Sequence, residues 1–245
     1  MKNKAVLDKT EMERVYQDTS KNHSPLLFSY FYNPIAFWIS TRILLNTSLT
    51  PNQLTMIGLI LAVIASFLMA TGRYPYLIAA ALLLQIVYIF DCMDGEIARL
   101  KKMCSNFGAW LDGTTDLFKM VLYYFALGMG YYQQSGKVEA WFLVSLLVSS
   151  RFLLNSIIKG IEQIFGQQVY KAIDSAKIYS IGARFGIEPQ FLTFSDDIKY
   201  FLISLGVILG QLKLTMIIFI FIHFSLWLLA IFKTGMTKYK EKEEG

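Results

Sequence analysis

Two nearby stretches of the chain read D-C-M-D-G-E-I-A-R at residues 91–99 and G-A-W-L-D-G-T-T-D at residues 108–116. An uncharged run, residues 74–90, precedes the first stretch, and another, residues 120–135, follows the second. A carboxylate at bilayer depth costs about 2.5–3.5 kcal/mol on insertion scales, so several of them together need a compensating cation. The two stretches therefore predict membrane helices that carry a functional site.

The acidic and small residues of each stretch recur at helical spacing. Positions 91, 94, 95 and 98 share one face of a helix, and positions 108, 112 and 116 share one face of a second helix. If these faces meet, four carboxylates converge, and such a site suits hard divalent cations with oxygen ligands. The small residues Gly95, Ala98 and Gly108 leave room on the same faces for a substrate.

The combined pattern, D-x2-D-G-x2-A-R-x8-G-x3-D-x3-D, closely resembles the signature of the CDP-alcohol phosphotransferase (CDP-alcohol phosphatidyltransferase) family, class I. Every fixed position of that signature is present. Eight specified residues at fixed spacing are far more specific than a lone glycine-rich loop. The plain alternative, a merely polar helix pair, is disfavoured because unpaired acids are expensive in a membrane.

This resemblance implies a membrane transferase of phospholipid biosynthesis. Family members move a substituted phosphate group, such as phosphatidyl, from a CDP-activated lipid such as CDP-diacylglycerol to an alcohol, and CMP leaves. The resemblance also implies two divalent ions, Mg²⁺ or Mn²⁺, and a homodimer.

Site residues follow from the resemblance position by position. The resemblance implies that Asp91, Asp94, Asp112 and Asp116 bind metal. It also implies that Asp116 is the catalytic base, which accepts the proton of the acceptor hydroxyl. The residues that the resemblance implies for CDP-alcohol binding are Asn52, Thr55, Asp91, Asp94, Gly95, Ala98, Arg99, Ser105, Gly108 and Asp112. Asn52 and Thr55 belong to a T-P-N-Q-L-T segment, residues 50–55, of the kind that contacts the nucleotide in family members.

The sequence gives weaker indications of which residues bind the acceptor alcohol. Arg151 lies within an apolar stretch, Lys159 follows eight residues later, and Lys199 is a further candidate. A phosphorylated polyol such as inositol phosphate or glycerol phosphate would need cations of this kind. An arginine within a span either binds an anionic ligand or pairs with an acid, and both readings of Arg151 stay open.

Composition supports a membrane protein independently of the motif. Of the 245 residues, 55% are hydrophobic and 17% are charged, and the length suits one compact unit. Apolar stretches near the length of a membrane span occur at about residues 54–71, 74–90, 120–135, 140–150, 200–212 and 214–232. We therefore expect an all-α integral membrane protein, a six-transmembrane-helix bundle with an N-terminal interfacial helix.

The expected domain organisation is simple. It comprises a polar cytoplasmic segment (1–28), a juxtamembrane interfacial helix (29–49), the six-helix domain (50–233) and a charged tail (234–245). An extra buried helix is the alternative for residues 29–49, and the polar segment 166–197 forms either an acceptor entrance or a plain solvated loop.

Lysine and arginine concentrate in alternate connections, so the positive-inside rule places both termini and the acidic site on the cytoplasmic side. We expect the membrane to be a prokaryotic cytoplasmic membrane. The net charge of +5 lies along membrane edges, which indicates contact with anionic lipids and no nucleic-acid partner.

Two rival functions remain, besides a pseudoenzyme that only scaffolds a complex, which is disfavoured because no motif carboxylate is lost. The first is a CDP-choline or CDP-ethanolamine phosphotransferase that uses a lipid alcohol as acceptor, which the short chain disfavours. The second is a cation transporter that uses the four aspartates as an ion site. Gly95, Ala98 and Gly108 argue against transport, because a simple ion cage does not need the space that they leave.

Overall fold

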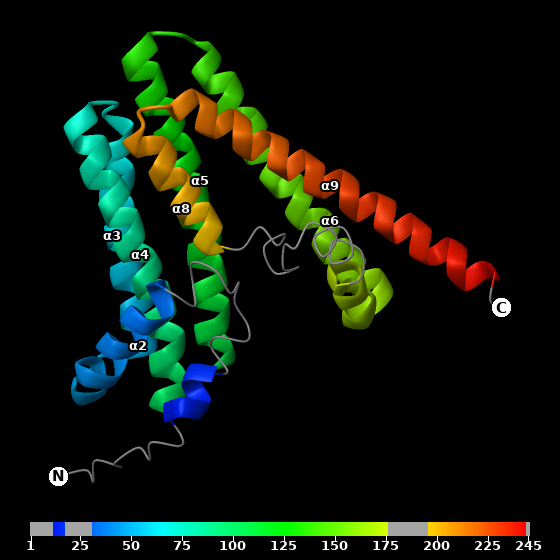
Figure 1. Ribbon diagram of the computed structural model, residues 1–245, viewed down its shortest axis with the longest axis horizontal. Coiled ribbons are helices and arrows are strands. Elements are labelled where there is room, and N and C mark those ends of the chain that lie inside the picture. Colours follow the sequence, from blue (N-terminus) through cyan, green and yellow to red (C-terminus); the bar gives the residue numbers. More distant parts are fainter. Residues whose placement is uncertain (1–11, 18–30, 176–195, 244–245) are drawn as a thin grey trace.

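The computed structural model describes residues 12–17, 31–175 and 196–243, and this part of the chain contains helices and no strand (Figure 1). The elements are α2 (Asn33–Arg42), the 3-10 turn η2 (Leu44–Asn46), α3 (Pro51–Ala70), α4 (Tyr74–Leu100), α5 (Asn106–Ser135), α6 (Glu139–Ser175), α8 (Asp196–Ile208) and α9 (Leu212–Glu243). The all-α prediction is confirmed for the described residues.

Local chemistry explains where the two helices beside the site begin. Thr50 starts α3 with a capping box, in which its side chain accepts from the Gln53 backbone N–H at 3.3 Å while Gln53 Oε1 accepts from the Thr50 N–H at 2.9 Å. Pro51 follows at the first helical position, where its missing N–H costs nothing. Ser105 caps α5 by accepting from the Gly108 N–H at 3.0 Å.

Each of the six expected apolar stretches lies largely in a helix, although the 200–212 stretch runs past the end of α8 at Ile208. Only part of the six-span prediction is borne out. Four helical segments of the described chain are long and apolar enough to cross a membrane: Pro51–Ala70, Tyr74–Leu100, Glu139–Ile157 and Leu212–Phe232. Helix α8 has 13 residues, and α5 carries Asp112, Asp116 and Lys119 among its apolar residues. The count of six spans therefore stays a prediction.

The long helices form two groups that meet at α5. Helices α3 and α4 pack on each other and on α5 or α8, whereas α6 and α9 run side by side and lean away from α3 and α4 (Figure 1). Gly128 permits the contact of α5 with α6, because a Cβ there would lie 2.0 Å from Val144 Cγ2. Gly136 ends α5 with a φ of 67°, a conformation that favours glycine, and allows the tight turn into α6.

A partly buried glutamine connects three parts of the fold. Gln85 of α4 accepts a hydrogen bond from the Tyr32 hydroxyl, just before α2, and its amide donates to Ser204 Oγ of α8 at 2.6 Å. These bonds join side chains that are far apart in the sequence, so they help to fix the relative positions of the segments. They hold α8, and with it one wall of the site, against α4.

Other parts of the expected organisation are only partly described. Helix α2 lies within the expected interfacial helix and buries Asn33, Ala36 and Ser40 while Trp38 is 59% exposed, but its place at a membrane surface stays a prediction. Most of the 1–28 segment, and residues 176–195 of the 166–197 segment, lie outside the described residues. Helix α9 continues through most of the charged tail to Glu243.

Candidate active site

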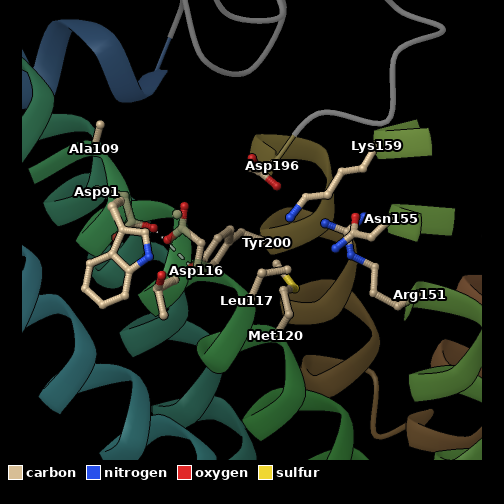
Figure 2. Close-up of a pocket in the computed structure, with 13 residues that line it drawn as sticks. Asp91, Ala109, Asp116, Leu117, Met120, Arg151, Asn155, Lys159, Asp196 and Tyr200 are labelled. Carbon is tan, nitrogen blue, oxygen red and sulfur yellow. Dashed lines mark hydrogen bonds between the residues drawn. The ribbon is translucent and has the colours of Figure 1, made fainter. Parts of the chain in front are cut away.

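Two cavities meet at α5, and Ala109 lines both. The α3–α5 cavity, about 200 Å³, lies among α3, α4 and the start of α5 and contains Asp94 and Asp112. The α5–α6 cavity, about 560 Å³, lies among α4, α5, α6 and α8 and contains Asp91 and Asp116 (Figure 2). The four motif aspartates are thus divided between two adjoining spaces.

The α3–α5 cavity collects residues that the motif connects with CDP-alcohol binding. Its lining includes Asn52, Thr55, Asp94, Gly95, Ala98, Arg99, Ser105, Gly108 and Asp112. Asp91, the remaining residue of that set, lines the α5–α6 cavity. Tertiary packing therefore brings the T-P-N-Q-L-T segment to the acidic helices, although the role of each residue stays a prediction.

Small residues shape the α3–α5 cavity. A Cβ on Gly108 would lie 3.2 Å from Asn52 Oδ1 and 3.1 Å from Ser105 Oγ, which is tighter than most real contacts. On α4, the guanidinium of Arg99 folds back over Gly95, where an added Cβ would lie 3.4 Å from Arg99 Nη1. Larger side chains at either glycine would take up space in the cavity.

A lysine just beyond α4 holds the segment that enters the cavity. Lys101 Nζ donates to the carbonyl oxygens of Thr47 at 3.0 Å and Leu49 at 2.7 Å. Partial burial lowers the pKa of the Lys101 ammonium. These bonds connect the end of α4 to the approach to α3, and they position the segment that carries Asn52.

In the α5–α6 cavity, the two carboxylates share one internal cation. Lys119 Nζ donates to Asp91 Oδ1 at 2.5 Å and to Asp116 Oδ1 at 2.8 Å, and the lysine side chain is fully buried. The Tyr200 hydroxyl of α8 donates to the other oxygen of Asp91 at 3.1 Å. Asp116 keeps 43% of its side chain exposed, so it faces the cavity while paired.

The opposite wall of this cavity is cationic. Arg151, Asn155 and Lys159 lie at four-residue spacing on α6, and Figure 2 shows their side chains extending toward the space in front of Asp116. Arg151 Nε is buried and has no hydrogen-bond partner in the described structure. Two of the three predicted acceptor residues thus share a cavity with two motif aspartates.

The third acceptor candidate lies elsewhere. Lys199 is buried, and its Nζ donates to Asp196 Oδ1 at 2.6 Å. Asp196 lines the α5–α6 cavity, whereas Lys199 is absent from its lining. Lys199 is therefore connected to the cavity lining through its bond to Asp196, and its role at the acceptor stays a prediction.

Sequence reasoning missed three polar residues of the site. Asn155 had a usable signal, because it lies midway between Arg151 and Lys159 on one helical face. Lys119 also had one, because it follows Asp116 by three residues on the same helix. Tyr200 had none, since only the packing of α8 on α4 brings it to Asp91.

Carboxylate oxygens such as those of the four motif aspartates suit a hard divalent ion. The four side chains do not meet at one point, however, because they are divided between two cavities. Among the residues that the structure describes, no three carboxylate, histidine or cysteine groups lie together so as to hold a metal ion. Asp94 and Asp112 line one cavity, and Asp94 Oδ2 accepts from Thr55 Oγ1 at 2.6 Å. Mg²⁺ is commonly held by one or two carboxylates, water and substrate phosphates, so this pair fits one ion. A second ion at Asp91 and Asp116 would have to displace Lys119.

Comparison with known proteins gives a family match over most of the chain. The family model for CDP-alcohol phosphatidyltransferase matches residues 48–233. A bifunctional IPC transferase and DIPP synthase of Aquifex aeolicus is 29% identical over 181 residues, which cover 71% of this chain and 37% of that protein.

Two further relatives match shorter parts of the chain. An archaetidylinositol phosphate synthase of Pyrococcus horikoshii is 32% identical over 89 residues, 36% of this chain and 46% of that protein. A phosphatidylinositol phosphate synthase of Corynebacterium glutamicum is 40% identical over 76 residues, 31% of this chain and 33% of that protein. The matched part is less than half the length of each of these three relatives. With four apolar helices and this family match, the chain is an integral membrane protein.

Proposed function

The chain belongs to the CDP-alcohol phosphatidyltransferase family, and from this premise we propose that it transfers a phosphatidyl-type group from a CDP-activated lipid to a phosphorylated polyol, with release of CMP. Inositol phosphate is the acceptor that we favour, because the names of three similar proteins refer to inositol phosphate products or to IPC and DIPP. Glycerol phosphate is the next acceptor to test.

The α5–α6 cavity is the observation that carries this proposal. Asp116 lies on one wall, and Arg151 and Lys159 lie on the other. A guanidinium and an ammonium bind phosphate well, and the buried Arg151 Nε has no acceptor in the described protein. An unphosphorylated acceptor would offer no anion to these two cations, whereas a phosphorylated polyol would offer one and would present its hydroxyl to Asp116.

The two cavities suggest how donor and acceptor meet. The α3–α5 cavity would hold the CDP part of the donor, with Asn52 and Arg99 on its walls, and the acceptor would enter the α5–α6 cavity. The two spaces adjoin at Ala109, so the donor phosphate that bears the lipid would lie beside the acceptor hydroxyl. Holding both reactants in line is the main task of a phosphoryl-transfer site.

In the reaction, the acceptor oxygen forms a bond to the phosphorus that carries the lipid, and the bond from that phosphorus to the CMP oxygen breaks. Asp116 accepts the hydroxyl proton as general base, and CMP leaves with the bonding electrons. The motif predicts Asp91, Asp94, Asp112 and Asp116 as metal ligands; of these, Asp94 and Asp112 line the α3–α5 cavity and would hold an ion, whereas Asp91 and Asp116 are bonded to Lys119. A bound Mg²⁺ or Mn²⁺ would neutralise charge on the pyrophosphate.

The rivals have less support. A lipid alcohol, as in a CDP-choline or CDP-ethanolamine enzyme, would bring no charge to match Arg151 and Lys159. A cation transporter would need its carboxylates open to passing ions, but Asp91 and Asp116 are already bonded to Lys119. The homodimer, the cytoplasmic orientation of the site and its termini, and the prokaryotic membrane stay predictions.

The test is CMP release by the purified chain in detergent with CDP-diacylglycerol and Mg²⁺ or Mn²⁺. Inositol phosphate, glycerol phosphate, inositol, serine and no acceptor form separate arms. We expect release that requires inositol phosphate and stops on chelation with EDTA. Equal release with inositol would contradict the role of the cationic wall. Failure to bind CDP-diacylglycerol would contradict the transferase assignment and favour the ion-site alternative.

A further inference from the structure

Lys119 is a buried cation inside the acidic cluster. Its side chain has no exposed area, and its ammonium lies 2.5 Å from Asp91 Oδ1 and 2.8 Å from Asp116 Oδ1. Asp91 comes from α4 and Asp116 from α5, so the lysine bridges the two helices. A cation between carboxylates of facing helices is the position that one divalent ion of a two-ion site would take.

The surroundings keep the ammonium in this position. Lys119 follows Asp116 by three residues on α5, so both side chains lie on the same helical face. Tyr200 occupies the other oxygen of Asp91 and is itself buried. The salt bridges of Lys119 in the described structure are those with Asp91 and Asp116. A metal ion that took these carboxylates would leave a buried ammonium without its counter-ions and directly beside a double positive charge, which is strongly unfavourable.

The remaining carboxylates are differently placed. Asp94 and Asp112 line the α3–α5 cavity, and the hydrogen bonds of Lys119 in the described structure go to Asp91 and Asp116 instead. Asp94 is bonded to Thr55. The carboxylate of Asp112 has no hydrogen-bond partner in the described residues. Two carboxylates with open coordination positions match what Mg²⁺ or Mn²⁺ needs beside a substrate phosphate and water.

We propose that the Lys119 ammonium takes the place of one of the two divalent ions, so that each chain binds a single Mg²⁺ or Mn²⁺, at Asp94 and Asp112. The inference rests on the proposed function for the ion's other ligands, which are the donor phosphates. Lys119 then supplies a fixed positive charge on the acceptor side of the transferred phosphate and orients Asp116 toward the acceptor.

Counting bound Mn²⁺ tests this inference without measuring activity. The metal-stripped full chain in detergent, with saturating CDP-diacylglycerol and no acceptor, is titrated with Mn²⁺, and free Mn²⁺ is followed by electron paramagnetic resonance. We expect one Mn²⁺ per chain for the wild type. We expect two for Lys119→Met, because Asp91 and Asp116 are then no longer bonded to Lys119 and can hold a second ion. Lys137→Met, a change to an exposed lysine beyond the far end of α5, should keep the count at one. Two Mn²⁺ in the wild type, or one in a folded Lys119→Met, would overturn the proposal.

A second pair of variants applies if Lys119→Met does not fold. Asp112→Asn should abolish Mn²⁺ binding, whereas Asp116→Asn should retain one ion, because Asp116 is assigned to Lys119 and not to the metal. Equal loss of Mn²⁺ in both variants would overturn the inference. The proposed function has a separate readout: a wild-type chain that binds one Mn²⁺ yet releases no CMP with any acceptor would contradict the function and leave the metal count intact.

Discussion

Thr55 and Asp94 meet across the interface of α3 and α4, where Thr55 Oγ1 donates a 2.6 Å hydrogen bond to Asp94 Oδ2. Thr55 is 4% exposed and Asp94 is 5% exposed, so water does not compete effectively for this bond. The bond joins the T-P-N-Q-L-T segment to the acidic motif, which lies 39 residues later in the chain. It holds one motif carboxylate in a single orientation at the wall of the α3–α5 cavity.

Thr55→Val keeps the shape of the side chain but removes this bond. We expect a loss of about 1–3 kcal/mol in stability, because a buried carboxylate loses a partner, and weaker binding of CDP. Thermal unfolding in detergent and CDP titration measure the two effects. Thr215→Val is the matched control: Thr215 is equally buried, and its hydroxyl, within the described part of the chain, bonds to the Gln211 carbonyl of the preceding turn at 2.9 Å. Equal loss of CDP affinity in both variants would contradict the role of Thr55.

Asp116→Asn preserves an acceptor for Lys119 and removes the base. We expect kcat for CMP release to fall by about 10²–10⁴-fold, while the Kd for CDP stays close to that of the wild type. Steady-state kinetics and CDP titration check this. Asp196→Asn is the control, because Asp196 also lines the α5–α6 cavity but lies outside the motif. A comparable fall in kcat for Asp196→Asn would show that kcat depends on negative charge in the cavity and not on Asp116 as a general base.

Gly108→Ala adds a methyl group to the wall of the α3–α5 cavity. The new Cβ would lie 3.2 Å from Asn52 Oδ1, so we expect CDP to bind several-fold more weakly while the fold is retained. Alanine favours the helix by roughly 0.5–1 kcal/mol over glycine, so thermal stability should not fall in parallel. Gly113→Ala on the same helix is the control, because its Cβ would meet nothing within 4 Å. Unchanged CDP affinity in Gly108→Ala would exclude close approach of the nucleotide.

Arg151→Gln and Lys159→Gln each remove one cation from the acceptor wall. Charged hydrogen bonds contribute about 1.5–3 kcal/mol, so we expect KM for inositol phosphate to rise by about ten- to a hundred-fold, with a smaller change in kcat. Lys199→Gln should raise this KM much less, because Lys199 does not line the cavity. If Lys199→Gln has the larger effect, the phosphate binds nearer to α8 than we propose.

Many residues of the α3–α5 cavity were predictable from the sequence, because their spacing places them on one face of a helix. Asp94, Gly95 and Ala98 share a helical face through their spacing alone, and the motif connects them with Gly108 and Asp112. The resemblance added Asn52 and Thr55, and the structure places all of these around one space. The six helical segments were predictable for a similar reason, since apolar runs of sufficient length favour membrane helices.

The α5–α6 cavity was less predictable, because it depends on contacts between distant elements. The sequence made Arg151 a candidate and left its acceptor-binding and ion-pairing roles open. Its position opposite Asp116 depends on how α6 packs, which the sequence does not show (Figure 2). For Lys199, the pairing with Asp196 depends on where α8 begins.

The amino-acid sequence determined the helical class, the two acidic faces and the family, since spacing along a helix and the cost of burying charge are properties of the chain itself. Only the tertiary structure decided how the four aspartates are shared. Packing of α4, α5 and α8 brings Lys119 and Tyr200 to Asp91, and it leaves Asp94 and Asp112 in a separate cavity. Helical spacing shows which side chains share a face, but the partner that neutralises a buried charge depends on which helices pack against that face.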